Sequence, residues 1–145
     1  MRAVRPVIAL SLIIPLVLVA TDVSRAGTSS REDRFRRLTN GERIERDIRR
    51  LRERTRLIKI ARRHSRRMAE RGKIFHTKNL SSKVEGWREI GELVGRGLRV
   101  RSIHERFMDS SSHRAEILYR PYDAIGVGVA RADGYIYVTE IFVNY

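Results

Sequence analysis

The 145-residue chain contains no cysteine, three prolines and few aromatic residues, which make up 7% of its composition. Without cysteine there is no disulfide framework, and no thiolate can act as a nucleophile or metal ligand. The sequence also lacks a Gly-x-Ser-x-Gly stretch, the nucleophile elbow of α/β-hydrolases. The fold therefore depends on packing alone, and the length suits one domain.

The chain begins with a basic residue pair and a short apolar run, Val7–Ala20, which only Ser11 and Pro15 interrupt. The small-residue site Ser24-Arg25-Ala26 follows, which is the layout of a secretory signal peptide. A helix of 14 residues spans about 21 Å, short of a hydrocarbon core of roughly 30 Å. We therefore predict a signal peptide over residues 1–26, cleaved after Ala26, and a secreted or extracytoplasmic protein. An uncleaved N-terminal membrane anchor is the alternative.

Positive charge dominates, with a formal net charge of +14. Residues 31–71 hold 17 basic and 7 acidic residues, a net +10, whereas residues 73–145 hold 11 and 9, a net +2. The arginine-rich first half favours an anionic partner, such as a lipid headgroup or an acidic surface polymer. Nucleic acid is disfavoured, because Phe35 is the only aromatic residue in this stretch that could stack on bases. The plainer interpretation is a solvated helix face.

Two helices are predicted in the first half. Widely spaced apolar residues predict a helix over 31–46, although Asn40-Gly41 favours a turn there. A connection over 47–54 follows. Residues 55–71 give the clearest amphipathic pattern, and Gly72 ends this helix.

The middle of the chain mixes a loop, a strand and two short helices. Residues 73–87 have no regular period and predict a loop, whereas 90–97 are strand-like. Ser102–Glu105 has the pattern of a capping box and predicts a helix start. Residues 113–118 predict a further helical turn, ended before a proline.

The C-terminal stretch predicts an antiparallel hairpin. Its strands, 124–130 and 135–143, are almost continuously apolar and are joined by a three-residue turn, Ala132-Asp133-Gly134. Strands this apolar are covered on both faces. Helices first and strands last predict an α+β layered sandwich.

An ordered series of motifs carries a family resemblance. It consists of IARRHSRRMAERG with FHT, GWREIGELVGRG, FMDSSSHRAEIL, IGVGVA and YIYVTEIFV. The series resembles the CAP superfamily of cysteine-rich secretory proteins, antigen 5 and pathogenesis-related proteins, and is most similar to its short, cysteine-free bacterial branch, also called SCP-like. The resemblance covers residues 38–145, after a basic lead-in over 27–37. It implies a three-layer α/β/α sandwich with a small antiparallel central sheet.

The resemblance further implies a cleft lined by two histidines and two acidic residues, which binds a divalent metal in some members. By position, the histidines are His76 and His113 and the first acid is Glu92. The second acid falls near Ser110, which is not acidic. Leu93 and Phe107 also depart from the asparagine and tryptophan usual in the family.

These departures bear on any metal. His76, His113 and Glu92 would form an N,N,O set suited to zinc, with one position open. Compared with the family pattern, Ser110 stands where a carboxylate is expected, and Leu93 stands where a polar side chain lies beside the cleft. We therefore expect no required cofactor and at most a weakly bound divalent metal through the two histidines. The alternative is that the imidazoles and the carboxylate hydrogen-bond to one another.

Other polar residues have plainer interpretations. His64 falls on the apolar face of the 55–71 helix and is expected in the core, whereas His104 is expected to be exposed. Glu140 lies within an apolar strand and is an outside candidate for the cleft. Trp87 is expected in the core or at the cleft rim.

Ser110 and His113 also pose the question of a serine nucleophile and its base. Three residues apart, they can meet within one helical turn. However, no orienting acid is evident beyond Glu92, and serines before a helix are more simply explained as N-caps.

Three functions from different classes follow. The favoured one is a secreted, non-catalytic CAP-type binding module for a lipid, a surface polymer or a protein. The second is a metal-dependent or serine hydrolase that uses His76, Glu92, His113 and Ser110. The third is a basic nucleic-acid-binding protein. The sequence does not name a ligand or an oligomeric state.

Overall fold

The computed structural model describes residues 20–145, so residues 1–19 of the predicted signal peptide lie outside the described part. Helix α1 (Ala20–Ile44) begins the described chain. It includes the segment expected as a basic lead-in, 27–37, which is helical throughout. Within the described range, no helix combines the length and apolar composition needed to cross a bilayer.

A small sheet forms the middle of the fold, with the strand order β1-β3-β4-β2. The β2, β4 and β3 strands are antiparallel, as predicted. The two-residue β1 lies in the expected connection and pairs with β3 in parallel, which the sequence did not reveal. The strands are β1 (Arg52–Glu53), β2 (Glu89–Gly97), β3 (Ala124–Ala132) and β4 (Tyr135–Asn144).

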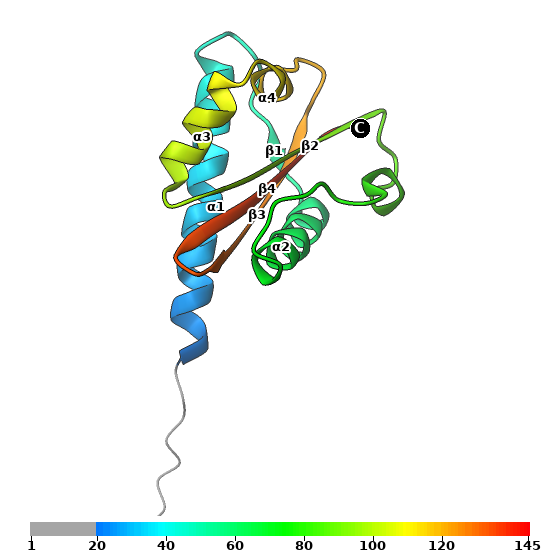
Figure 1. Ribbon diagram of the computed structural model, residues 1–145. Coiled ribbons are helices and arrows are strands. Elements are labelled where there is room, and N and C mark those ends of the chain that lie inside the picture. Colours follow the sequence, from blue (N-terminus) through cyan, green and yellow to red (C-terminus); the bar gives the residue numbers. More distant parts are fainter. Residues whose placement is uncertain (1–19) are drawn as a thin grey trace, which may run out of the picture.

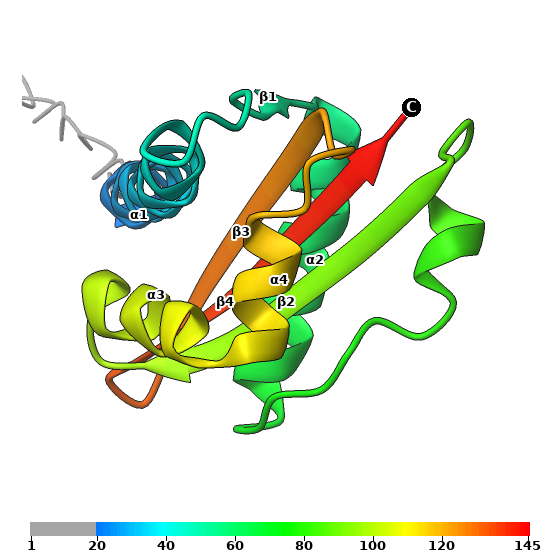
Figure 2. The ribbon, with the colours of Figure 1, turned by 90° about the horizontal axis from the view of Figure 1, so that it is seen from above.

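Helices cover both faces of the sheet. Figure 2 shows α2 (Thr55–Glu70) behind the sheet and α1, α3 (Val100–Asp109) and α4 (Ser111–Ile117) in front of it. The 73–87 loop runs past the β2 edge and contains a short 3₁₀ helix, η1 (Leu80–Lys83). The predicted three-layer α/β/α sandwich is therefore confirmed.

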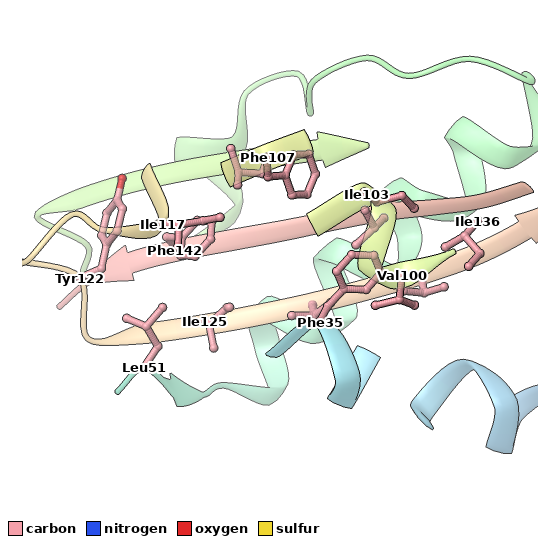
Figure 3. Packing of buried hydrophobic residues seen from close by; sticks show 14 residues of the cluster. Phe35, Leu51, Val100, Ile103, Phe107, Ile117, Tyr122, Ile125, Ile136 and Phe142 are labelled. Carbon is pink, nitrogen blue, oxygen red and sulfur yellow. The ribbon is translucent and has the colours of Figure 1, made fainter. Parts of the chain in front are cut away.

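The larger hydrophobic core fills the layer between the sheet and the α1, α3 and α4 helices. Phe35 of α1, Ile103 of α3 and Phe142 of β4 meet there, almost without exposed surface (Figure 3). Because side chains alternate along a strand, every second residue of β3 and β4 points into this layer. The nearly continuous apolar strands are thus explained by burial on both faces.

Two glycines of β3 let α2 approach the sheet closely on the opposite face. A Cβ atom on Gly126 would lie 2.3 Å from the Leu57 carbonyl carbon, and one on Gly128 would lie 2.1 Å from the Arg62 amide nitrogen. Both distances are below any van der Waals contact. The backbone of α2 therefore rests directly on the strand, and Leu57 and Ala61 pack beside the glycines without exposed surface.

Two local predictions are wrong. Helix α3 begins at Val100 with Arg99 as its N-cap, so Ser102 lies inside the first turn and its hydroxyl donates to the Arg99 carbonyl instead of forming a capping box. His104 lies on the buried face of α3 with Val100, and its exposed fraction is 3% rather than high.

The hairpin turn is also shorter than predicted. Ala132 pairs with Tyr135, so two residues form the loop, Asp133 and Gly134. Their φ values are +49° and +78°. Positive φ at both central positions is the pattern of the two-residue hairpin turn that matches strand twist.

The guanidinium of Arg43, which has no exposed surface, ties the end of α1 to the end of α4 and the segment after it. It donates to the carbonyls of Ile117 and Tyr119, both at 2.8 Å, and of Tyr122 at 3.2 Å, while its Nε donates to Arg49 at 3.0 Å. Burial, together with the nearby arginines, lowers the pKa of Arg43 to about 10. The group therefore stays charged at neutral pH.

We expect Arg43→Lys to lower the free energy of unfolding by roughly 2–4 kcal/mol, because one ammonium cannot reach carbonyls arranged for a planar fork. Urea unfolding measures this. The matched control is Arg46→Lys, where the exposed side chain pairs with Glu42 at 2.7 Å and the change should stay within about 0.5 kcal/mol. Equal losses in both variants would contradict this role for Arg43.

We expect Gly128→Ala to destabilise the fold by roughly 2–3 kcal/mol or more, since its methyl group forces α2 off the sheet. The control is Gly41→Ala in α1, where an added Cβ meets nothing within 4 Å and should stabilise the protein by about 0.5–1 kcal/mol. Thermal and urea unfolding of both variants measure this. A Gly128→Ala variant as stable as the wild type would refute the direct contact between the α2 backbone and β3.

Candidate functional site

His76 and Glu92, two of the predicted site residues, are in contact. The Nδ1 atom of His76 lies 2.9 Å from Oε2 of Glu92. The Glu92 side chain is 6% exposed, whereas that of His76 is 66% exposed. The β2 strand thus holds a sheltered carboxylate, and the loop after α2 lays an exposed imidazole over it.

Thr77 completes this contact and uses the remaining acceptor capacity of Glu92. Its backbone amide donates to Oε2 at 2.8 Å and its hydroxyl donates to Oε1 at 2.5 Å. Both carboxylate oxygens are therefore engaged by the 76–77 segment. A carboxylate held in this way fastens the loop to the edge strand and is not a free general base.

His64 holds the same loop from the side of α2. Its Nε2 atom lies 2.5 Å from the Phe75 carbonyl oxygen, and its ring packs edge-on against the Phe75 ring at 5.1 Å. Burial lowers the pKa of His64, against the opposing effect of the Phe75 carbonyl. The prediction of a packed core histidine is confirmed, because the side chain has no exposed surface.

His113 lies near the start of α4, where its ring packs edge-on against Phe107 at 5.4 Å. Within residues 20–145 it forms no hydrogen bond or ion pair with His76 or Glu92. Glu92 points toward the α2 layer, since its neighbour Leu93 belongs to the core on the other face. The convergence of both histidines on one cleft stays a prediction.

Ser110 is the N-cap residue of α4, as expected, but it makes no side-chain cap hydrogen bond. Its hydroxyl lies 3.2 Å from that of Ser112. No hydrogen bond joins it to His113 within the described chain. The contact that a serine nucleophile needs with its base is therefore missing from this arrangement.

The side chains around Glu92 determine whether a metal ion can bind there. Among the described residues, no group of three or more histidines and carboxylates lies close enough to hold a metal ion. Glu92 already accepts three hydrogen bonds from the loop. The arrangement does not fit a three-ligand zinc centre, and we derive no chemistry from one.

Glu140, the outside candidate, is fully buried and faces α1 instead of a cleft. Oε2 accepts a hydrogen bond from the Thr39 hydroxyl at 2.9 Å, while Oε1 has no partner among the described residues. Burial raises the pKa of Glu140 to about 8, and the Thr39 hydrogen bond only partly opposes this shift. The carboxyl is therefore protonated near neutral pH, and its role is structural.

Trp87 lies at the rim of a hollow of about 420 Å³ at the β2 edge, which the sequence did not reveal. Tyr122 donates to Glu116 at 2.8 Å in this hollow, and Tyr119 donates to Glu89. Burial and the Glu116 carboxylate raise the pKa of Tyr122. Residues so far apart along the chain gave no local motif, so only the fold brings them together.

A basic hollow of about 340 Å³ lies on the outer face of α2. Apart from Ile60, every residue that lines it is a cation. These are Arg56, Lys59, Arg63 and Arg67 of α2 and Lys83 of η1. The sequence pattern placed Lys59, Arg63 and Arg67 on the charged face of this helix, but not Arg56. Lys83 was missed, because nothing in the irregular 73–87 segment indicates that η1 folds back beside α2.

Comparison with known proteins identifies the family. Residues 36–145 match the model of the CAP family, described as the cysteine-rich secretory protein family. The match covers more than half of the chain, and the chain therefore belongs to the CAP family. No curated protein matches the chain.

Solved structures share the fold. An extracellular SCP-domain protein from Bacillus anthracis superposes with a TM-score of 0.73 at 18% identity, over 88% of this chain and 45% of that one. An outer surface protein from Borrelia burgdorferi gives 0.72 at 15% identity, over 79% and 92%. A cysteine-rich secretory protein from Staphylococcus aureus gives 0.71 at 21% identity, over 81% and 39%. The chain thus spans less than half of the Bacillus and Staphylococcus proteins.

Glu140→Gln should remove a pH-dependent loss of stability. Because the pKa is raised from 4.5 in the unfolded chain to about 8 in the fold, the full contribution of the neutral carboxyl is present below pH 4.5. It is lost as the pH rises to about 8. We expect the variant to be more stable than the wild type by roughly 1–3 kcal/mol at pH 8.5 and nearly equal at pH 4.5.

Urea unfolding of both proteins between pH 4.5 and 8.5 measures this difference. Parallel stability curves over the whole range would show that Glu140 does not take up a proton in the fold.

Proposed function

We propose that this CAP-family protein is a non-catalytic binding module that acts outside the cytoplasm and engages an anionic partner at a cell surface. The observation that supports the proposal is that residues predicted for catalysis are engaged in hydrogen bonds inside the protein. Glu92 spends both oxygens on the 76–77 segment, and Ser110 bonds Ser112 rather than a histidine. Among the described residues predicted for hydrolysis, no hydrogen bond joins the serine to a histidine, so no activated nucleophile is assembled.

The surplus of positive charge supports an anionic partner. Salt bridges neutralise some arginines of the first half, such as Arg62 with Glu32 at 2.5 Å and Arg46 with Glu42 at 2.7 Å. Lys59, Arg63 and Arg66 have no ion-pair partner among the described residues. A surface field of this kind attracts polyanions and anionic headgroups.

The extracytoplasmic location rests on the predicted signal peptide. The Bacillus relative, which shares the fold, is described as extracellular, and the Borrelia one as an outer surface protein. An anionic lipid headgroup or an acidic surface polymer is the partner expected in that setting. Hydrolysis is the alternative that a turnover measurement separates from binding, and nucleic acid is separated by comparing DNA with another polyanion.

We expect the purified full chain to hydrolyse neither generic esters nor peptides above the rate of a His113→Ala variant, and to contain less than one metal ion per molecule. The same preparation should bind an immobilised polyanion, with an affinity that falls steeply as salt is added. Turnover that the His113→Ala variant loses would sink the non-catalytic proposal. Failure to bind any anionic probe at low salt would sink the anionic partner.

A further inference from the structure

The outer face of α2 does not pack against the core. The opposite face carries the packing, because Gly126 and Gly128 bring the α2 backbone onto β3. The buried residues of α2 all belong to that inner face: Leu57, Ala61, His64, Ser65, Met68 and Ala69. The outward cations are therefore held on a rigid support, and their side chains are not needed for packing against the sheet.

These cations form a row along the helix. Arg56, Lys59, Arg63 and Arg67 follow one another at intervals of three or four residues, which keeps them on one face. With a rise of 1.5 Å per residue, neighbours in the row are about 4.5–6 Å apart along the axis. Lys83 of η1 forms the second wall of the hollow.

Little inside the protein neutralises this row. Arg56 pairs with the exposed Glu85 at 2.8 Å. Arg67 contacts the neutral acceptor Nδ1 of His64 at 3.1 Å, and the Lys83 ammonium donates to backbone carbonyls. Lys59 and Arg63 form no hydrogen bond or ion pair within residues 20–145. Four of the five cations thus lack a carboxylate partner.

We infer that this hollow on α2, lined by Arg56, Lys59, Arg63, Arg67 and Lys83, is a binding site for a linear phosphate-bearing polymer lying along the helix axis. This inference rests on the proposed anionic partner and names its chemistry and its location. Arginine guanidinium groups recognise phosphate oxygens in a bidentate manner, and a repeating polyanion offers one group to each cation of the row.

The lining of the hollow favours a non-nucleic polymer over single-stranded nucleic acid or insertion into a membrane. No aromatic side chain lines it, so it offers nothing on which bases stack. Its apolar residue, Ile60, is only partly exposed and forms no inserting surface.

The test uses inorganic polyphosphate as probe and two doubly substituted variants of the full chain. Lys59→Glu with Arg63→Glu reverses two charges in the α2 hollow. Arg99→Glu with Arg101→Glu reverses two exposed charges in a separate hollow of about 540 Å³ beside α3. Each variant lowers the net charge by four, from +14 to +10, so net charge is matched.

We expect the α2 variant to lose polyphosphate affinity by at least tenfold more than the α3 variant. Its slope of log affinity against log salt should be shallower by roughly 1.4, about 0.7 for each lost contact. Polyphosphate should also raise the melting temperature of the wild type and not that of the α2 variant. Unchanged melting temperatures without ligand would show that both variants fold.

Each other outcome has a distinct meaning. If the wild type binds no anionic probe, both this site and the anionic partner fail. If it binds polyphosphate and the two variants lose affinity equally, only the α2 site fails. Tighter binding of single-stranded DNA, or of vesicles with anionic lipid, than of polyphosphate at matched charge overturns the polymer and assigns the surface to that ligand.

Discussion

The buried guanidinium of Arg43 is the contact on which the arrangement of the front layer depends. It gathers carbonyl groups from the segment after α1 and from the end of α4 onward. No regular element satisfies these carbonyls, and leaving them unpaired in the interior is costly. A single cation therefore fixes where α4 ends relative to α1. The end of α4 and the segment that follows it are thereby held in the same layer as the core residue Phe107.

The sequence predicted the layers well because they follow from periodicity. The amphipathic 55–71 pattern and the apolar hairpin are strong local signals, and both elements lie where they were expected. The family resemblance then fixed the order of the layers. Contacts between distant segments were not predictable in this way. The burial of His104 depends on the packing of α3 against α1, where it lies 3.7 Å from Glu42, and the Arg43 network depends on carbonyls over 70 residues away.

The candidate site was predicted in part, for the same physical reason. His76 and Glu92 do meet, as their positions in the motifs indicated. Their partner Thr77, which occupies the carboxylate, carries no motif of its own and becomes visible only when the loop is folded against β2. A site inferred from residue types alone thus overestimates reactivity, because hydrogen bonds inside the protein can consume the acceptors that chemistry would need.

The close approach of α2 to Gly126 and Gly128 of β3 places different constraints on the two faces of this helix. Residues on the inner face cannot change without moving a backbone that touches β3 directly. On the outer face, Lys59 and Arg63 form no hydrogen bond or ion pair within residues 20–145, so substitutions there cost the fold almost nothing. Charge on the outer face of this helix can therefore differ among proteins of this fold without loss of stability. Ligand binding then decides which charges each protein keeps. Comparing that face between relatives would report on what each one binds, independently of how well each one folds.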